Sequence, residues 1–508
     1  MAGLALPLLI ALLAGLAQAG SIAAPWNGQP QWWLQLLSLA VLAWLVRGAS
    51  SWRRAGGLGW IFATAWLAGT FWWLFISMHV YGGLAAPLAA LAVLALAAFL
   101  GSYYALASAL FWALPRTGRS QGAMVFGAAW LLAELLRARW FTGFPWGAGG
   151  YAHVEGPLAF LAPWAGVYGM GFVAALLAFG LSLAAGAGWR SWRYWSAAGA
   201  AAALLAACNY VVPTEGSSPG PRLSVALLQG NIPQDEKFEG RSGVPLALAW
   251  YGEQLRAAQA SLVVAPETAI PSLPQQLPEG YLAGLGEHFA QGRKAALVGI
   301  PLGSFEQGYT NSAIGIRPGS EVYRFDKHHL VPFGEFIPPL FRWFTDLMNI
   351  PLGDFNRGAV GQPSFEWQGQ RLAPNICYED LFGEELGARF LDPAKAPTVF
   401  VNLSNIAWFG NTVAIDQHLH ISRMRSLEFE RPMIRATNTG ATAIIDHRGR
   451  VTHLLPRHTR GVLTGEVEGR SRITPFAWWV SRLGLWPLWG LALAPLAFAA
   501  WRRRIAAQ

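Results

Sequence analysis

Residues 371–382 read RLAPNICYEDLF, a stretch that places Cys377 between a short apolar run and an acidic turn. The run RLAPNIC predicts a β-strand that ends at the cysteine. The chain has only two cysteines in 508 residues. Strand ends in a helix-covered sheet open into a crevice, so this thiol is a candidate for chemistry rather than for packing.

The stretch belongs to a segment that alternates short strands with helices. The segment follows the linker PTEGSSPGPR, after which short apolar runs are separated by Gly and Pro. The other strand candidates are RLSVALLQ, SLVVAPE, AALVGIPLG, SAIGIR, PTVFVNLS and ATAIIDHRG, and the helix candidates are LALAWYGEQLRAAQA and DQHLHISRMRSLEFE. This alternation predicts an α/β domain over residues 213–473, with a mixed or parallel sheet covered by helices.

The rest of the chain has the composition of a membrane protein. Hydrophobic residues make up 54% of the sequence and charged residues 13%. A helix needs roughly 20 apolar residues to cross a bilayer. The apolar runs predict about eight spans, at residues 3–19, 32–46, 57–79, 84–113, 121–140, 161–187, 194–212 and 475–501.

The basic residues predict the orientation of these spans. Every second connection is basic, and the arginines stand at 47, 53 and 54, at 116 and 119, at 190 and 193, and at 502–504. The positive-inside rule makes these connections cytoplasmic, so residues 213–473 lie on the opposite side. We expect an N-terminal transmembrane domain over 1–212 and a C-terminal helix with a basic cytoplasmic tail over 474–508. The first apolar run ends in A-Q-A like a cleaved signal peptide, but it lacks a basic start, and we interpret it as a retained helix.

Lys and Arg exceed Asp and Glu by 37 to 28, but the excess forms no single stripe, so no nucleic-acid partner is expected.

Two further polar residues stand at predicted strand ends and complement the cysteine. Glu267 closes SLVVAPE, and Lys327 follows EVYRFD. A thiol becomes a good nucleophile when a base removes its proton or a cation lowers its pKa. Glu267 is a candidate for the base, and Lys327 is a candidate for the cation and for stabilising an oxyanion.

The motifs around these three residues carry a resemblance to a known superfamily. APETAIP, FDKHHLVPFGEFIP and NICYEDLF, in this order, resemble the Glu-Lys-Cys elements of the carbon-nitrogen hydrolase (nitrilase) superfamily. With membrane spans on both sides, the chain resembles one family in particular, the apolipoprotein N-acyltransferases. TGFPW from Thr142, QGNIPQ from Gln229, NLSNIAWFG from Asn402 and RPMIRATNTGATA from Arg431 extend the resemblance to almost the whole chain.

The resemblance implies a nitrilase-like α-β-β-α sandwich and an acyl transfer in two steps. Cys377 would take a fatty acyl chain from a phospholipid, typically phosphatidylethanolamine, as a thioester. The α-amino group of a diacylglyceryl-cysteine on an apolipoprotein would then attack the thioester, which is the last step of bacterial lipoprotein maturation. The enzyme would lie in the bacterial inner membrane with its catalytic domain in the periplasm. No cofactor and no metal is implied.

The resemblance also implies roles for residues around the triad. Glu335 matches a second family glutamate and would orient Lys327 or bind the reacting group, and Glu379 and Tyr378 flank the nucleophile. Trp146, Tyr151 and Trp408 are expected in loops at the bilayer surface. Candidate substrate contacts are Phe238, Trp408, Trp146, Tyr151 and Arg139, the last of which could reach a lipid phosphate. The sequence departs from the family at Phe238, commonly a tryptophan, and at Ile406, usually an aspartate.

Other interpretations stay open at this point. A membrane-anchored amidase or other hydrolase could use the same triad and pass the acyl group to water. His328 and His329 would allow a Cys-His pair, but they follow Lys327 in what should be a strand, where successive side chains point to opposite faces. We interpret both as structural. The second cysteine, Cys208, lies at the end of a predicted span and is interpreted as a buried apolar thiol.

Overall fold

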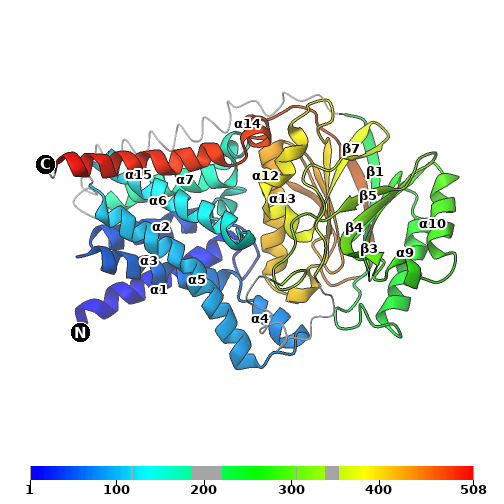
Figure 1. Ribbon diagram of the computed structural model, residues 1–508, viewed down its shortest axis with the longest axis horizontal. Coiled ribbons are helices and arrows are strands. Elements are labelled where there is room, and N and C mark those ends of the chain that lie inside the picture. Colours follow the sequence, from blue (N-terminus) through cyan, green and yellow to red (C-terminus); the bar gives the residue numbers. More distant parts are fainter. Residues whose placement is uncertain (1, 116–117, 185–219, 305, 338–353, 507–508) are drawn as a thin grey trace. The chain divides into compact units, whose positions relative to one another are not determined.

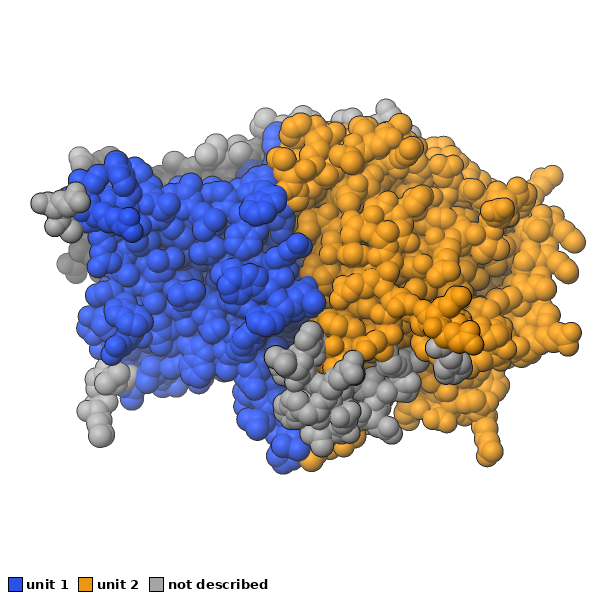
Figure 2. Space-filling model, in the orientation of Figure 1, with its two compact units in different colours: residues 1–75, 86–213, 485–508 blue, residues 76–85, 214–484 orange. Residues whose placement is uncertain are grey.

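A computed structural model describes residues 2–115, 118–184, 220–304, 306–337 and 354–506 (Figure 1). The chain divides into two compact units, which Figure 2 distinguishes by colour. Unit 1 comprises Met1–Phe75, Ala86–Pro213 and Leu485–Gln508, and unit 2 comprises Ile76–Ala85 and Thr214–Gly484.

Unit 1 is helical because its sequence consists of long runs rich in Leu, Ala and Trp, with little to interrupt a helix. Its main helices are α1 (Ala2–Ile22), α2 (Trp32–Arg47), α3 (Trp52–Thr70), α5 (Ala86–Ala113), α6 (Arg119–Arg139), α7 (Ala162–Ala184) and α15 (Trp486–Ala506). Within the described ranges, three helices are long and apolar enough to cross a membrane, or up to five if two bent pairs each count as one span. The predicted number of eight spans stays a prediction.

Two of the predicted spans are interrupted helices in the structure. The span at 57–79 is interrupted, because α3 ends at Thr70 and a separate short helix, α4 (Leu74–Ile76), follows. The span at 475–501 is also interrupted. Helix α14 (Pro475–Leu483) stops before Gly484, which has a φ of +54° that glycine adopts without strain.

The predicted span at 194–212, and Cys208 within it, lie outside the described residues.

Unit 2 contains two six-stranded sheets. The first has the strand order β12-β1-β2-β3-β4-β5, and the second has the order β11-β10-β9-β8-β7-β6. The first sheet consists of β1 (Arg222–Gln229), β2 (Leu262–Ala265), β3 (Ala295–Ser304), β4 (Gly308–Ile316), β5 (Tyr323–Asp326) and β12 (Gly461–Glu468). The second consists of β6 (Phe365–Trp367), β7 (Gln370–Ile376), β8 (Val399–Ser404), β9 (Met433–Thr437), β10 (Ala443–Ile445) and β11 (Val451–Leu454). Both are mixed sheets: β1, β2 and β3 pair in parallel in one, and β7, β8 and β9 do so in the other.

The two sheets pack face to face, with helices on their outer faces (Figure 1). Alternate residues of β1 point to opposite sides: Leu223, Val225 and Leu227 enter the core between the sheets, whereas Ala226 and Leu228 pack beneath α9 (Gly243–Ala257) and α10 (Tyr281–Ala290). Helices α12 (Gly383–Gly387) and α13 (Ala414–Phe429) lie on the side of the second sheet. These four layers form the α-β-β-α sandwich that the resemblance implied.

Candidate active site

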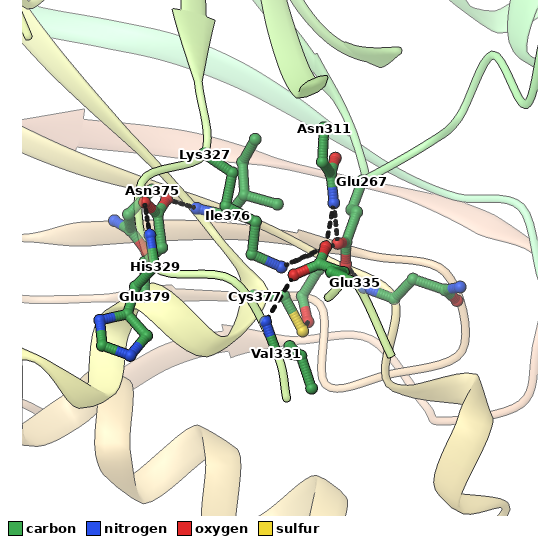
Figure 3. Close-up of polar contacts among 12 residues, drawn as sticks. Glu267, Asn311, Lys327, His329, Val331, Glu335, Asn375, Ile376, Cys377 and Glu379 are labelled. Atoms are coloured by element: carbon green, nitrogen blue, oxygen red, sulfur yellow. Dashed lines mark hydrogen bonds and ion pairs between the residues drawn. The ribbon is translucent and has the colours of Figure 1, made fainter. Parts of the chain in front are cut away.

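The ends of strands from both sheets bring the three predicted catalytic residues together. Glu267 follows β2 and Lys327 follows β5, both in the first sheet, whereas Cys377 follows β7 in the second. Figure 3 shows the sulfur of Cys377 beside the side chains of Glu267, Lys327 and Glu335. The site therefore lies where the two sheets face each other, and Cys377 packs against the core between them.

The centre of the site is a buried cluster of two carboxylates and one ammonium group. Lys327 is 1% exposed, and its Nζ donates to Glu335 Oε1 at 2.8 Å and to Glu267 Oε1 at 3.4 Å. The amide Nδ2 of Asn311 donates to the same two oxygens, at 2.7 Å each (Figure 3). Main-chain N–H groups of Asn405 and Val331 bind the remaining oxygens of Glu267 and Glu335, both at 2.8 Å. Each carboxylate is therefore fixed through both of its oxygens.

Cys377 stands at a sharp turn from strand to helix. Its φ is +51°, in the left-handed region that a non-glycine residue occupies only when its surroundings hold it there. Its carbonyl oxygen accepts from His418 Nε2 at 3.2 Å and from Asn402 Nδ2 at 3.4 Å. Its sulfur accepts from the Ser404 hydroxyl at 3.3 Å. These contacts hold the turn that presents the thiol to the carboxylate cluster.

The electrostatics of the site place the proton on sulfur at rest. Burial, and then the negative charge of Glu267, raise the pKa of the Cys377 thiol to about 12. Burial would raise the pKa of Glu267 as well, but Lys327 and the Asn311 amide outweigh it, and the pKa falls below its usual value. The pKa of Lys327 is raised, because Glu335 and Glu267 outweigh the opposing effect of burial. The resting site thus holds a neutral thiol next to an ionised carboxylate, and Glu267 can accept the proton when the sulfur attacks.

Glu379 supports the site from behind and does not join the carboxylate cluster. Its two oxygens accept from the main-chain N–H groups of Ile376 at 2.7 Å, His328 at 2.7 Å and His329 at 3.3 Å. Burial raises the pKa of Glu379 to about 7. Glu379 thereby ties the loop that carries Lys327 to the turn that carries Cys377.

Aromatic packing surrounds the same loop. Tyr378 is 4% exposed, and its ring lies 5.3 Å from that of Phe382. The strand predicted for the two histidines was wrong, because β5 ends at Asp326. His329 stacks on Phe382 and its Nδ1 lies 2.9 Å from Glu385 Oε1. Nothing in these contacts places an imidazole against the sulfur.

The two substrate-binding candidates of unit 2, Phe238 and Trp408, are half-buried. The Phe238 ring lies 5.9 Å from the Nζ of Lys237, its chain neighbour. The Trp408 ring contacts Tyr81 edge to face at 5.8 Å, so the segment Ile76–Ala85 packs on the loop that contains Trp408. Ile406, where the family usually has aspartate, is 1% exposed. Whether Phe238 and Trp408 contact substrate stays a prediction.

The other three candidates belong to unit 1. The side chains of Trp146 and Tyr151 are 3% and 0% exposed, and the Trp146 ring lies 4.8 Å from that of Trp73. That their loops face the bilayer surface stays a prediction. The apolar rings of both residues are buried in packing because the loop that carries them folds back among the helices. Arg139 is exposed at the end of α6. Their roles toward substrate stay predictions.

The residues that hold Glu267 in place were not identified from the sequence. Asn311 lies on β4, and no sequence motif distinguishes it from other asparagines. Its contact with Glu267 arises only when the first sheet forms. A signal did exist for Asn405, which lies in the quoted motif NLSNIAWFG. Its side chain accepts from Asn438 at 3.2 Å and donates to Gln234 at 2.9 Å, so three of the quoted motifs meet behind Glu267.

A buried ionic network behind the nucleophile was also missed. Asp380 Oδ1 lies 3.0 Å from His418 Nε2, and its Oδ2 lies 3.4 Å from the Arg435 guanidinium. All three side chains are buried. Asp380 follows Cys377 by three residues, so the network fixes the turn and the helix α13 to each other. Across the described ranges, no group of three or more His, Cys, Asp or Glu could hold a metal ion.

Comparison with known proteins places this fold and site in a class. Residues 224–475 match the carbon-nitrogen hydrolase family, and residues 11–180 match the apolipoprotein N-acyltransferase N-terminal domain. A CN-hydrolase superfamily protein from Xanthomonas campestris, with a solved structure, is 20% identical, with a TM-score of 0.36 over 49% of this chain and 91% of that one. The family match over residues 224–475 identifies the α/β unit as a carbon-nitrogen hydrolase domain.

The whole-length relatives are more specific. An apolipoprotein N-acyltransferase from Verminephrobacter eiseniae is 65% identical, covering 94% of this chain and 92% of the relative. One from Ralstonia nicotianae is 48% identical, covering 93% and 90%. The chain belongs to the apolipoprotein N-acyltransferase family, and this membership favours acyl transfer over the hydrolase alternative.

Proposed function

We propose that this protein transfers a fatty acyl chain from a phospholipid, through a thioester on Cys377, to the N-terminal amine of the diacylglyceryl-cysteine of apolipoproteins. Family membership supports the overall reaction. The observation that supports the residue assignment is the meeting of Glu267, Lys327 and Cys377 at the facing ends of two sheets, with an ionised carboxylate beside a neutral thiol.

In the first half-reaction, the Cys377 sulfur attacks the carbonyl carbon of the phospholipid ester while Glu267 takes the thiol proton. The carbonyl oxygen becomes an oxyanion, which the Lys327 ammonium stabilises. The C–O bond of the ester then breaks, and Glu267 returns the proton to the departing alcohol. The products are a lysophospholipid and an acylated Cys377. We propose phosphatidylethanolamine as the donor.

In the second half-reaction, the neutral α-amino group of the acceptor attacks the thioester carbonyl. Glu267 takes up the proton that the amine loses, the C–S bond breaks, and Glu267 passes the proton to the departing sulfur. The acceptor is now N-acylated and Cys377 is free. Glu335 shares the ammonium of Lys327 with Glu267, and we assign it the role of orienting that lysine.

We propose that the chain spans the inner membrane about eight times, with domains over 1–212, 213–473 and 474–508. The support is the alternation of basic connections with uncharged ones along the sequence. This topology places the catalytic domain in the periplasm, at the leaflet where a lipid-anchored acceptor could reach it. Phe238, Trp408, Trp146, Tyr151 and Arg139 remain proposed contacts for the two lipids.

The test is intact-protein mass spectrometry of the purified protein mixed with phosphatidylethanolamine and no acceptor. We expect a gain of one fatty acyl mass, which hydroxylamine removes and Cys377→Ser abolishes. Cys208→Ser is the matched control and should keep the adduct. Free fatty acid without an adduct would assign the protein to hydrolysis. If neither the adduct nor free fatty acid forms, the phospholipid is refuted as the donor.

A further inference from the structure

A second buried lysine stands at the same site. Lys237 lies in the loop between β1 and α9 and is 1% exposed. Its Nζ donates to the main-chain oxygen of Glu267 at 3.1 Å. Among the residues that the structure describes, no carboxylate lies within ion-pair distance of this ammonium group. A buried cation without a paired anion is unfavourable in a fold, so its position calls for a reason.

The charges of the site supply that reason. Glu267 and Glu335 carry two negative charges close together, and Lys327 supplies one positive charge, which it shares unequally: its Nζ lies 2.8 Å from Glu335 and 3.4 Å from Glu267. With a neutral thiol, these three groups leave an excess of one negative charge. Lys237 brings the cluster to neutrality from the side of Glu267.

The titration behaviour of the groups agrees with this geometry. Burial lowers the pKa of Lys237 to about 7, against the opposing effect of Glu267 and Cys377. Lys237 is therefore charged in the acidic range in which Glu267 titrates, because the pKa of Glu267 is held below its usual value. In turn, Lys237 is one of the groups that lower the pKa of Glu267, after Lys327 and the Asn311 amide.

We propose that Lys237 is a positioning residue for the general base: its ammonium group fixes the main chain at Glu267 and supplies the positive charge that keeps the Glu267 carboxylate ionised beside Cys377. The ionisable groups around this carboxylate are Lys237, Lys327, Glu335 and Cys377. This inference rests on the proposed function, which assigns Glu267 as the base.

The test follows alkylation of Cys377 by iodoacetamide as a function of pH, in the full-length protein in detergent and without lipid. Peptide mass spectrometry separates Cys377 from Cys208. If Glu267 takes the proton during alkylation, the rate falls at acidic pH as Glu267 becomes protonated. We call this fall in rate the acid limb of the pH–rate profile. We expect the midpoint of the acid limb to lie about one pH unit higher in Lys237→Met, because a neighbouring opposite charge shifts a carboxyl pKa by that order.

Two further variants separate charge from structure. Lys237→Gln can still donate to the Glu267 carbonyl but has no charge, and we expect its limb to move as in Lys237→Met. Lys237→Arg keeps the charge and should keep the limb near its original pH. Lys294→Met is the matched control, because Lys294 also donates to a main-chain oxygen, that of Ala258, away from the site, and should leave the profile unchanged.

The outcomes distinguish this inference from the function on which it rests. If the alkylation rate of Cys377 in Glu267→Gln equals that of the unchanged protein at every pH, Glu267 is not the base, and the inference is refuted with it. The other outcome is that the acid limb depends on Glu267 but keeps its midpoint in both Lys237→Gln and Lys237→Met, while the alkylation rate falls equally at all pH values. This result would refute the inference alone and leave Lys237 a structural residue. If Lys237→Met fails to fold, the acid-limb midpoints of Lys237→Gln and Lys237→Arg are compared instead, and equal midpoints would refute the inference.

Discussion

Asn311 offers the sharpest test of how the base is held. Its amide Nδ2 donates to Glu267 Oε1 and to Glu335 Oε1, both at 2.7 Å, and the residue is 4% exposed. In Asn311→Ala both carboxylates lose this shared donor, and water has little access to replace it. The two oxygens then repel each other with only the Lys327 ammonium between them, so we expect Glu267 to move and its pKa to rise.

The size of the effect follows from the two contacts. A hydrogen bond to a charged group is worth about 1.5 to 3 kcal/mol, and the lower value is appropriate because one amide group serves both carboxylates. The sum is about 3 kcal/mol, which corresponds to a fall of roughly 100-fold in rate if all of it is lost from the transition state. The assay is thioester formation under single-turnover conditions, followed by intact mass.

Asn356→Ala provides the control for this experiment. The Asn356 amide also donates a hydrogen bond, to the Gln307 carbonyl at 2.8 Å, but it lies at an exposed position away from the two carboxylates. This variant should react at the original rate. A rate for Asn311→Ala within threefold of the original, in folded protein, would show that the amide does not organise the two carboxylates for reaction.

Two other predictions concern pH and the backbone at the base. Because the pKa of Glu267 is held below its usual value of 4.5, its charged form persists as pH falls, and thioester formation should stay constant from pH 8 to about 5. Transfer to the acceptor needs a neutral α-amino group with a pKa near 7.7 to 8.0, so it should fall about tenfold per pH unit below that range. Single-turnover assays would measure the two half-reactions separately. If the rates of both fell together as the pH is lowered, the predicted difference in pH dependence would be wrong. In Gly299→Ala, the new Cβ would lie 2.7 Å from Glu267 Cα, which forces the base to shift, and we expect at least a tenfold slower thioester formation. Gly286→Ala, whose Cβ meets nothing within 4 Å, is its control, and equal rates in both variants would disprove the steric argument.

Local patterns explain why much of the fold and the centre of the site could be predicted. The strand before Cys377 was readable because a short, mainly apolar run leads directly to an acidic turn, and β7 ends at Ile376. Glu267 and Lys327 were found for the same reason, since Lys327 directly follows β5 and Glu267 stands two residues after the end of β2. A residue marked by its own neighbours in sequence can be identified without a structure.

The residues that sequence reasoning missed act through partners far along the chain. Asn311 contacts a glutamate 44 residues earlier and another 24 residues later, and the main-chain N–H of Asn405 binds a carboxylate 138 residues before it. The interruption of the predicted span at 57–79 follows the same principle. An apolar run such as 57–79 continues past Thr70 without any change in hydropathy that would mark the break, so tertiary packing decides where the helix ends.

The charge arrangement explains how a reactive thioester site could remain inert between turnovers. A thiol whose pKa is raised to about 12 is almost entirely protonated at neutral pH, so it does not react with passing electrophiles through a standing thiolate. Its activation depends on a carbonyl group that accepts the sulfur while Glu267 accepts the proton. The negative charge then passes to the carbonyl oxygen, where Lys327 can stabilise it, while the total charge of the cluster stays constant. A bound ester or thioester should therefore react faster than a small electrophile that diffuses in, because its carbonyl oxygen takes up a negative charge that Lys327 can stabilise.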